Sequence, residues 1–263
     1  MKKSKKLFVG VDVGGTKLLA ALVKPNGKIV ARRRCNTPRN TTSDEVVAAI
    51  LQLIEYTLAD KKLSAKHVKA IGLGVPGVVD SDEGRVVLTP NMNLSEVPLA
   101  ALIKEQFRVP VAVGNDVNLG TLGEKWLGGA RLAESAVGIF VGTGIGSGII
   151  LDGKLLRGSR EAAGEIGHIV MQIGGPKCGC GARGCLEALA SRSAIERDIR
   201  QAVEDGQKTM LTKLLGGDLK IIRSRMLHQA LEQGDALTRQ ALRGIWLERR
   251  DANGQEEQAP PGD

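Results

Sequence analysis

Short runs of consecutive apolar residues, each ending at a glycine-rich or polar turn, recur along the first half of the chain. Runs of this kind are typical of strands buried in an α/β sheet, whereas apolar residues spaced three or four apart indicate helices. The pattern predicts strands over residues 7–13, 18–23, 28–33, 68–74 and 109–113. It predicts helices over residues 43–58, 97–107 and 116–127, the first with Ser43 as its N-cap.

The same order of elements then restarts, shifted by roughly 128 residues. A strand over residues 135–141 precedes a glycine-rich turn, a strand over residues 149–151 and a hairpin turn at Asp152. Recurrence of one strand–turn–strand unit predicts two similar α/β lobes facing each other across a cleft, which we place at residues 1–118 and 119–243. Helices are expected over residues 186–203 and 224–242, and a disordered tail over residues 244–263.

Composition narrows the class of protein. Apolar residues make up 42% of the 263 residues and aromatic residues only 2%, so the core must be aliphatic. The net charge of +8 raises the possibility of a nucleic-acid partner, but few aromatic side chains are present for base stacking, so none is expected. No apolar run reaches the length of a membrane span, and Asp12 interrupts the first run too early for a secretory signal. We therefore expect a cytoplasmic protein without a membrane partner.

Three of the four cysteines fall within eight residues, with a histidine upstream: His168, Cys178, Cys180 and Cys185. Three thiolates and one imidazole form a complete tetrahedral set for Zn²⁺, and a closed set of four ligands is structural rather than catalytic. One alternative is three small core cysteines beside a surface histidine. A disulfide is the other, but Cys178 and Cys180 lie too close in sequence to pair comfortably and a third thiol would remain. Zinc is the preferred interpretation, and reduced thiols fit the cytoplasm.

Two carboxylates flank this cysteine stretch. Glu165 precedes His168 and Glu187 follows Cys185. A metal site that fixes the loop would hold both carboxylates in place, as acceptors for the hydroxyl groups of a sugar. Taken singly, each could instead be a solvated loop acid.

Two glycine turns have the composition of phosphate-binding hairpins. In the first, Gly14 and Gly15 allow backbone N–H groups to converge on an anion, Thr16 adds a hydroxyl donor, and Asp12 could hold a hydrated Mg²⁺. The second turn, residues 142–146, repeats this device, and plain turn chemistry is the alternative for either one. The first turn lacks the P-loop's Gly-Lys-Ser/Thr, and no long helix follows it as a dinucleotide site would require. The pair fits a nucleoside triphosphate.

A candidate general base lies between the two turns. The strand over residues 109–113 delivers Asn115 and Asp116 to its carboxyl end. Asp116 could accept the proton of a substrate hydroxyl while that oxygen attacks the γ-phosphate. The alternative is that Asp116 is an ordinary helix N-cap.

Four segments resemble, in order, the motifs of the ROK family of bacterial sugar kinases and repressors, and most of all those of its glucokinases. The segments are residues 12–17, 114–118, 142–146 and 164–187. The resemblance runs from about residue 7 to about residue 242. It implies an actin-like (ribonuclease H-like) α/β fold of two lobes with a structural zinc loop. It also implies ATP-dependent phosphorylation of glucose at the C6 hydroxyl, with Mg²⁺ and Zn²⁺, in a homodimer.

The resemblance assigns roles residue by residue. Asp116 is the base, and the other sugar-binding residues are Asn91, Asn115, Glu165, His168 and Glu187. The nucleotide-binding residues are Asp12, Gly14, Gly15, Thr16 and Lys17 in the first turn and Gly142, Thr143 and Gly144 in the second. His168 ligates zinc through its other ring nitrogen.

The resemblance stops after about Arg243, where no Val-Leu-Gly-Gly-Gly turn follows. A frameshift or early stop is the simplest account, and we expect the second lobe to lack part of its sheet and its adenine wall, with apolar surface left uncovered. A non-catalytic sugar-binding remnant is therefore one alternative to a kinase. A sugar-responsive regulator is another, although it would need a helix-turn-helix ahead of Leu7, where six residues lie.

Overall fold

The computed structural model describes residues 6–90 and 92–243. The predicted tail and Asn91 lie outside the described residues. The chain divides into two compact units, Met1–Ile139 with Ser147–Glu165, and Phe140–Gly146 with Ile166–Asp263. This division differs from the predicted boundary after residue 118. Helix α3 (Asp116–Leu127) and most of the second set of strands group with the first unit, because Gly148 packs directly against the Thr121 side chain of α3.

The first unit is built on a five-stranded sheet in the order β3-β2-β1-β4-β7. Its strands are β1 (Leu7–Val13), β2 (Lys17–Val23), β3 (Ile29–Asn36), β4 (Val68–Val75) and β7 (Val111–Asn115). Strands β1, β4 and β7 are parallel, whereas β2 and β3 pair antiparallel as a meander from β1. The predicted strands of this sheet are thereby confirmed: β1 matches at both ends, and the ends of the other strands differ by at most three residues.

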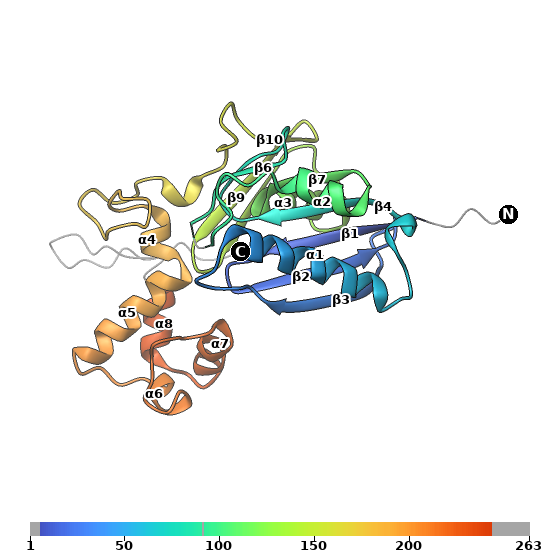
Figure 1. Cartoon of the computed structure of the whole chain (residues 1–263). Coiled ribbons are helices and arrows are strands. Elements are labelled where there is room, and N and C mark those ends of the chain that lie inside the picture. The colour runs from blue at the N-terminus through green and yellow to red at the C-terminus, as the bar shows by residue number, and fades with distance from the viewer. Residues whose placement is uncertain (1–5, 91, 244–263) are drawn as a thin grey trace. The chain divides into compact units, whose positions relative to one another are not determined.

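Two helices cover one face of this sheet, α1 (Ser43–Ala59) and α2 (Leu99–Phe107), and α1 runs across the strands (Figure 1). Alternate residues of β1 and β2, such as Val11 and Leu18, are buried there in an aliphatic core, as the low aromatic content predicted. The N-cap of α1 is Thr42 rather than Ser43. Thr42 and Glu45 form a reciprocal capping box, which satisfies backbone donors that the neighbouring serine would leave unpaired.

The opposite face of the sheet carries small residues and receives the start of α3. A Cβ atom at Gly74 would lie 3.3 Å from the Cα of Asp116, and one at Gly114 would lie 3.3 Å from a methyl carbon of Leu119. The two glycines therefore let α3 begin close against β4 and β7.

The second set of strands forms a three-stranded sheet in the order β10-β9-β8. Its strands are β8 (Ala136–Val141), β9 (Ile145–Leu151) and β10 (Lys154–Leu156). The order strand, glycine turn, strand, hairpin, strand thus repeats that of β1 to β3. Strand β9 begins at Ile145 rather than 149. A small hairpin of β5 (Val78–Asp80) and β6 (Arg85–Leu88) follows β4, and a 3-10 turn η1 (Ala65–His67) precedes it; neither was predicted.

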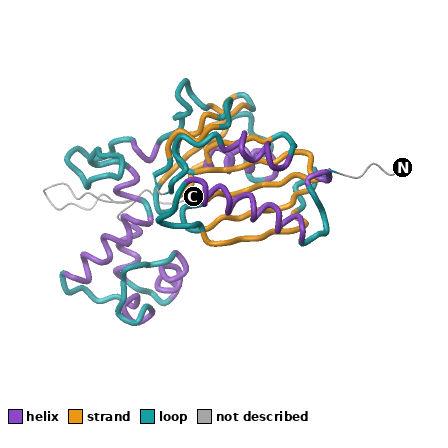
Figure 2. Tube along the Cα trace, viewed as in Figure 1, coloured by secondary structure: helices purple, strands orange, loops and turns teal. Residues whose placement is uncertain are grey.

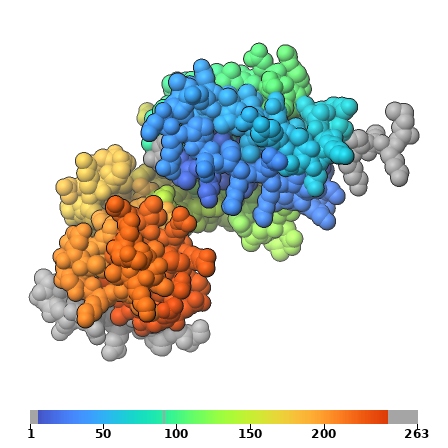
Figure 3. Space-filling view, turned by 60° about the horizontal axis from the view of Figure 1, so that its bottom comes forward, coloured from blue at the N-terminus to red at the C-terminus, as the bar shows by residue number. Residues whose placement is uncertain are grey.

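Residues 166–243 of the second unit contain helices and loops, with no strand among the described residues (Figure 2). They are η2 (Ile166–His168), α4 (Leu186–Ala190), α5 (Arg192–Glu204), α6 (Met210–Leu214), α7 (Ser224–Glu232) and α8 (Ala236–Arg243). The side chains of α5 to α8 pack into a core of their own. Figure 3 shows the surface of these helices as one compact group of orange and red atoms. Within residues 6–90 and 92–243, no helix is both long and apolar enough to cross a membrane.

Two predicted helices are each divided in two. The segment 186–203 breaks at Ser191, whose hydroxyl accepts a hydrogen bond from the Ala194 amide and starts α5. The segment 224–242 breaks at Gly234, which has a positive φ of 79°, and Asp235 then accepts from the Thr238 amide at 2.7 Å. Serine and aspartate favour caps over helix interiors because their oxygens compete for backbone donors.

Candidate functional site

Two carboxylates meet at the carboxyl edge of the five-stranded sheet. Asp12 of β1 aligns with Gly74 of β4, and Gly74 aligns with Gly114 of β7, so Asp116 follows β7 at the same edge. Burial raises the pKa of Asp116, although the Val117 amide, donating to its Oδ1 at 2.9 Å, partly opposes this. The pKa of Asp12 is also raised, first by partial desolvation and then by the charge of Asp116. A carboxyl group that binds a proton more readily is suited to act as a general base.

Asn115 fixes the start of α3. Its Oδ1 accepts from the Asn118 amide at 3.0 Å, and its Nδ2 donates to the Gly77 carbonyl at 3.0 Å. The N-cap of α3 is therefore Asn115, and Asp116 is the first helical residue rather than the cap. This arrangement removes the alternative in which Asp116 serves only as the N-cap.

The first glycine hairpin is closed by its own backbone and tied to the loop after β3. The Gly14 amide donates to the Lys17 carbonyl at 3.1 Å, so a phosphate would have to use other groups of this turn. Thr37 donates from its hydroxyl to the Gly14 carbonyl at 2.5 Å and from its amide to the Thr16 carbonyl at 3.0 Å. Arg39 donates to the Thr16 hydroxyl at 3.3 Å. Thr37 and Arg39 were not singled out from the sequence, because they lie about 20 residues after the first glycine hairpin and do not belong to a recognisable motif.

The second glycine hairpin repeats this closure. The Gly142 amide donates to the Gly144 carbonyl at 2.8 Å, and the Gly142 carbonyl accepts from the Arg192 amide of α5 at 2.9 Å. The exposed Thr143 lies at the tip of the turn and lines a cavity of about 260 Å³ within the second unit. Other residues lining this cavity include Lys177, Cys178, Glu187, Ser193 and Arg197.

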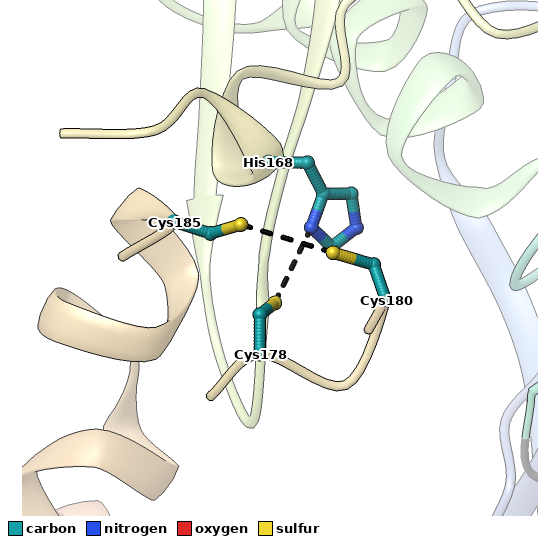
Figure 4. A group of neighbouring side chains, drawn as sticks. All are labelled: His168, Cys178, Cys180 and Cys185. Atoms are coloured by element: carbon teal, nitrogen blue, oxygen red, sulfur yellow. Dashed lines mark hydrogen bonds between the residues drawn. The ribbon is translucent and has the colours of Figure 1, made fainter. Parts of the chain in front are cut away.

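The four predicted zinc ligands lie together in the second unit (Figure 4). Their ligand atoms all lie within 4.8 Å of one another. The Cys178 Sγ is 3.6 Å from the His168 Nδ1, and the Sγ atoms of Cys180 and Cys185 are 3.7 Å apart. Zinc binds sulfur at about 2.3 Å and nitrogen at about 2.0–2.1 Å, so a tetrahedral site requires about 3.6 Å between sulfur and nitrogen and about 3.8 Å between sulfurs. The donor set therefore fits zinc.

The same distances exclude a disulfide within this arrangement, since a disulfide would bring two sulfurs to about 2.0 Å. Desolvation, followed by hydrogen bonds and charges of the neighbouring sulfurs, raises the pKa of Cys185 to about 11. The pKa of Cys180 is lowered, mainly by a hydrogen bond from the Ala182 amide. Because the thiols must lose protons to ligate a cation, zinc binding would release protons.

The two flanking carboxylates differ in their surroundings. Glu165 is exposed in the loop before η2, whereas Glu187 is half-buried in the first turn of α4. Glu187 Oε2 accepts from the Ile145 amide at 2.8 Å, and its Oε1 lies 3.7 Å from the Cys178 Sγ. The bond to Ile145 was not foreseen, because it joins residues 42 positions apart.

These features define the class of protein as one with the actin-like fold of sugar kinases and a zinc loop. Its site combines two glycine hairpins with a carboxylate at the edge of a mixed sheet. The chain belongs to the ROK family, whose family model matches residues 8–248.

Both kinases and regulators are among the similar proteins. A glucokinase from Thermotoga maritima is 35% identical over 229 residues, which cover 87% of this chain and 70% of the relative. A xylose repressor from Caldicellulosiruptor bescii is 32% identical over 235 residues, 89% of this chain and 58% of the repressor. The chain thus spans little more than half of that repressor's length. The crystal structure of a ROK family glucokinase from Streptomyces griseus in complex with glucose and AMPPNP superposes with a TM-score of 0.79 at 32% identity, covering 91% of this chain and 75% of that one.

Proposed function

We propose that this protein is an ATP-dependent hexose kinase that transfers the γ-phosphoryl group of ATP to the C6 hydroxyl of glucose. The observation that carries the proposal is the half-buried Asp116, whose pKa is raised and which shares the sheet edge with Asp12. The glucokinase relatives support the substrate class, and the similar structure with glucose and AMPPNP supports ATP as the donor.

In this mechanism Asp116 takes the proton of the sugar hydroxyl as its oxygen attacks phosphorus, and the bond to the leaving diphosphate breaks. General-base catalysis of this kind contributes about 10²–10⁴-fold. Asp12 would hold Mg²⁺, which neutralises charge on the phosphates when bound. The hairpin residues Gly15, Thr16 and Lys17 and the second turn, Gly142–Gly144, would bind the phosphates.

The remaining proposed residues orient the sugar. Asn91, Asn115, Glu165, His168 and Glu187 would bind its other hydroxyls, and the Nδ1 of His168 faces Cys178. The zinc loop would keep His168 and Glu187 in fixed positions. Thiolate ligands require a reducing compartment, so we place the protein in the cytoplasm.

The test is sugar-dependent release of ADP by the purified full chain. Asp116→Asn should lower turnover by about 10²–10⁴-fold while glucose binding, measured by calorimetry, stays within about two-fold. Asp82→Asn is the matched control, because Asp82 is an exposed acid paired with Arg157. Undiminished turnover in Asp116→Asn would remove Asp116 as the base.

A sugar-binding protein without turnover is the second candidate, and the similarity to a xylose repressor favours it specifically. The same assay separates the two functions. Sugar binding with no ADP release from the wild-type chain would support a regulator or a non-catalytic remnant over a kinase. Binding to duplex DNA would then distinguish the regulator.

A further inference from the structure

The carboxylate of Glu187 connects the zinc loop, residues 178–185, to the second glycine hairpin, residues 140–146. One carboxylate oxygen accepts from the Ile145 amide at 2.8 Å, and the other lies 3.7 Å from the Cys178 Sγ. Ile145 is 5% exposed, so its amide depends on this acceptor more than a surface amide would. A hydrogen bond from an amide to an ionised carboxylate is also among the stronger kinds in proteins.

The approach of Glu187 to the hairpin requires Gly144. A Cβ atom at this position would overlap the Oε2 of Glu187, whereas a Cβ atom at Gly142 would meet no heavy atom within 4 Å. Neither glycine has a positive φ. Gly144 is therefore needed here for the space it leaves to a side chain, and not for its backbone conformation.

The position of Glu187 is set by the zinc ligands. Cys185 is the N-cap of α4, and Glu187 lies in the first turn of this helix. Cys185 is fully buried and its Sγ lies 3.7 Å from the Sγ of Cys180. Any ion held by these sulfurs fixes Cys185, and Glu187 lies only two residues further along the same helical turn.

We propose that Glu187 is a positioning residue that couples occupancy of the zinc site to the conformation of the hairpin at Gly142–Gly144. Backbone hydrogen bonds already hold the ends of the loop between Cys178 and Cys185, from the Gly184 amide to the Pro176 carbonyl at 2.8 Å and from the Leu186 amide to the Ile169 carbonyl at 2.9 Å, so the ion adds to this framework by fixing the sulfurs. Without the ion, the Cys185 side chain and the first turn of α4 are held less tightly, so Glu187 protects the Ile145 amide less well. Where the hairpin binds nucleotide phosphates, which rests on the proposed function, zinc also sets nucleotide affinity.

Hydrogen exchange at the Ile145 amide tests this coupling directly. The full chain loaded with zinc is compared with the same chain stripped by a chelator under reducing conditions. We expect Ile145 to exchange about ten-fold faster or more after stripping. The buried Ile199 amide in α5 serves as the reference that the unit stays folded. Equal protection of Ile145 in both forms, with Ile199 still protected, would overturn the proposal.

Variants at Gly144 and Gly142 form a matched pair. In Gly144→Ala the Ile145 amide should exchange fast with or without zinc, because the new methyl group displaces the carboxylate. In Gly142→Ala exchange should follow the wild type. Glu187→Gln keeps an acceptor oxygen and should retain the response to zinc, whereas Glu187→Ala should abolish it. Wild-type behaviour of Glu187→Ala would show that another group protects Ile145.

The thermodynamic linkage between zinc binding and nucleotide binding gives a second test of the coupling. If zinc tightens binding of AMPPNP, then AMPPNP must tighten binding of zinc by the same factor. A response of Ile145 to zinc in a chain without sugar-dependent ADP release would leave the coupling standing while the kinase proposal fails. Turnover without any response of Ile145 to zinc would leave the kinase proposal standing while the coupling fails.

Discussion

Asp116, the proposed general base, lies where its charge is unfavourable for the stability of the fold. Burial raises its folded pKa above the value of about 3.9 in an unfolded chain, so the folded state binds the proton more tightly. Its contribution to stability is therefore present below about pH 4 and is lost as the pH rises through the folded pKa. The charge of Asp116 also raises the pKa of Asp12, so the two carboxylates repel each other at neutral pH.

Asp116→Asn should for this reason increase the free energy of unfolding at pH 7, and the increase should disappear below about pH 4. Urea unfolding at both pH values measures it. Asp60→Asn is the control, and it should decrease the free energy of unfolding at pH 7, because the hydrogen bond from Arg33 lowers the pKa of Asp60. A lower stability of Asp116→Asn at pH 7 would contradict the assignment of a desolvated carboxylate.

The zinc ligands make a second prediction at the scale of single residues. Cys180→Ala removes one of four ligands and should weaken zinc binding more than about 100-fold, since a ligand matters at least as much as the groups that orient it. Sugar affinity should fall with it. Metal analysis of the reduced protein measures the zinc content, and Cys35→Ala is the control because Cys35 lies outside the cluster. Stoichiometric zinc in Cys180→Ala would exclude the assigned ligand set.

At the scale of elements, the packing of α3 on the sheet decides where Asp116 lies. Gly74→Ala places a methyl group 3.3 Å from the Asp116 Cα, so the start of α3 must move by a few tenths of an ångström. We expect turnover to fall by about ten-fold, since catalysis is sensitive to displacements of this size.

Gly72→Ala is a matched control for this change, because it lies on the same face of β4 and meets no heavy atom within 4 Å. It should leave turnover unchanged and raise stability by about 0.4–1 kcal/mol through the unfolded state. Equal turnover in the two variants would show that α3 does not position the base.

The elements also show where sequence patterns suffice. Strands β1, β4 and β7 follow from short apolar runs that end at turn residues, although the structure buries mainly alternate residues of β1 and β4. The division of helices at Ser191 and Gly234 was missed, because apolar spacing continues across both breaks and only the local caps end each helix.

At the scale of the whole molecule, β8 presents an apolar surface. It is the outer strand of its sheet in the described part of the chain, and Val137, Ile139 and Val141 on one side of it are 58%, 58% and 62% exposed. An exposed apolar edge strand favours association with other chains.

Ile139→Lys should therefore shift association of the full chain to about ten-fold higher concentration, measured by light scattering over a dilution series. Leu132→Lys is the control, because Leu132 is 89% exposed but lies in a loop rather than at a sheet edge. Equal effects of both variants would mean that added charge alone, and not the edge strand, controls association.

The sequence by itself determined the strands of the main sheet, the glycine turns and the cluster of one histidine and three cysteines that fits zinc, because each depends on residue types that lie close together along the chain. Tertiary structure alone decided that Asn115 joins the start of α3 to the Gly77 carbonyl, that burial raises the pKa of Asp116, and that Glu187 binds the Ile145 amide. These three properties depend on partners that only folding brings into contact, and no local pattern encodes the distance between them.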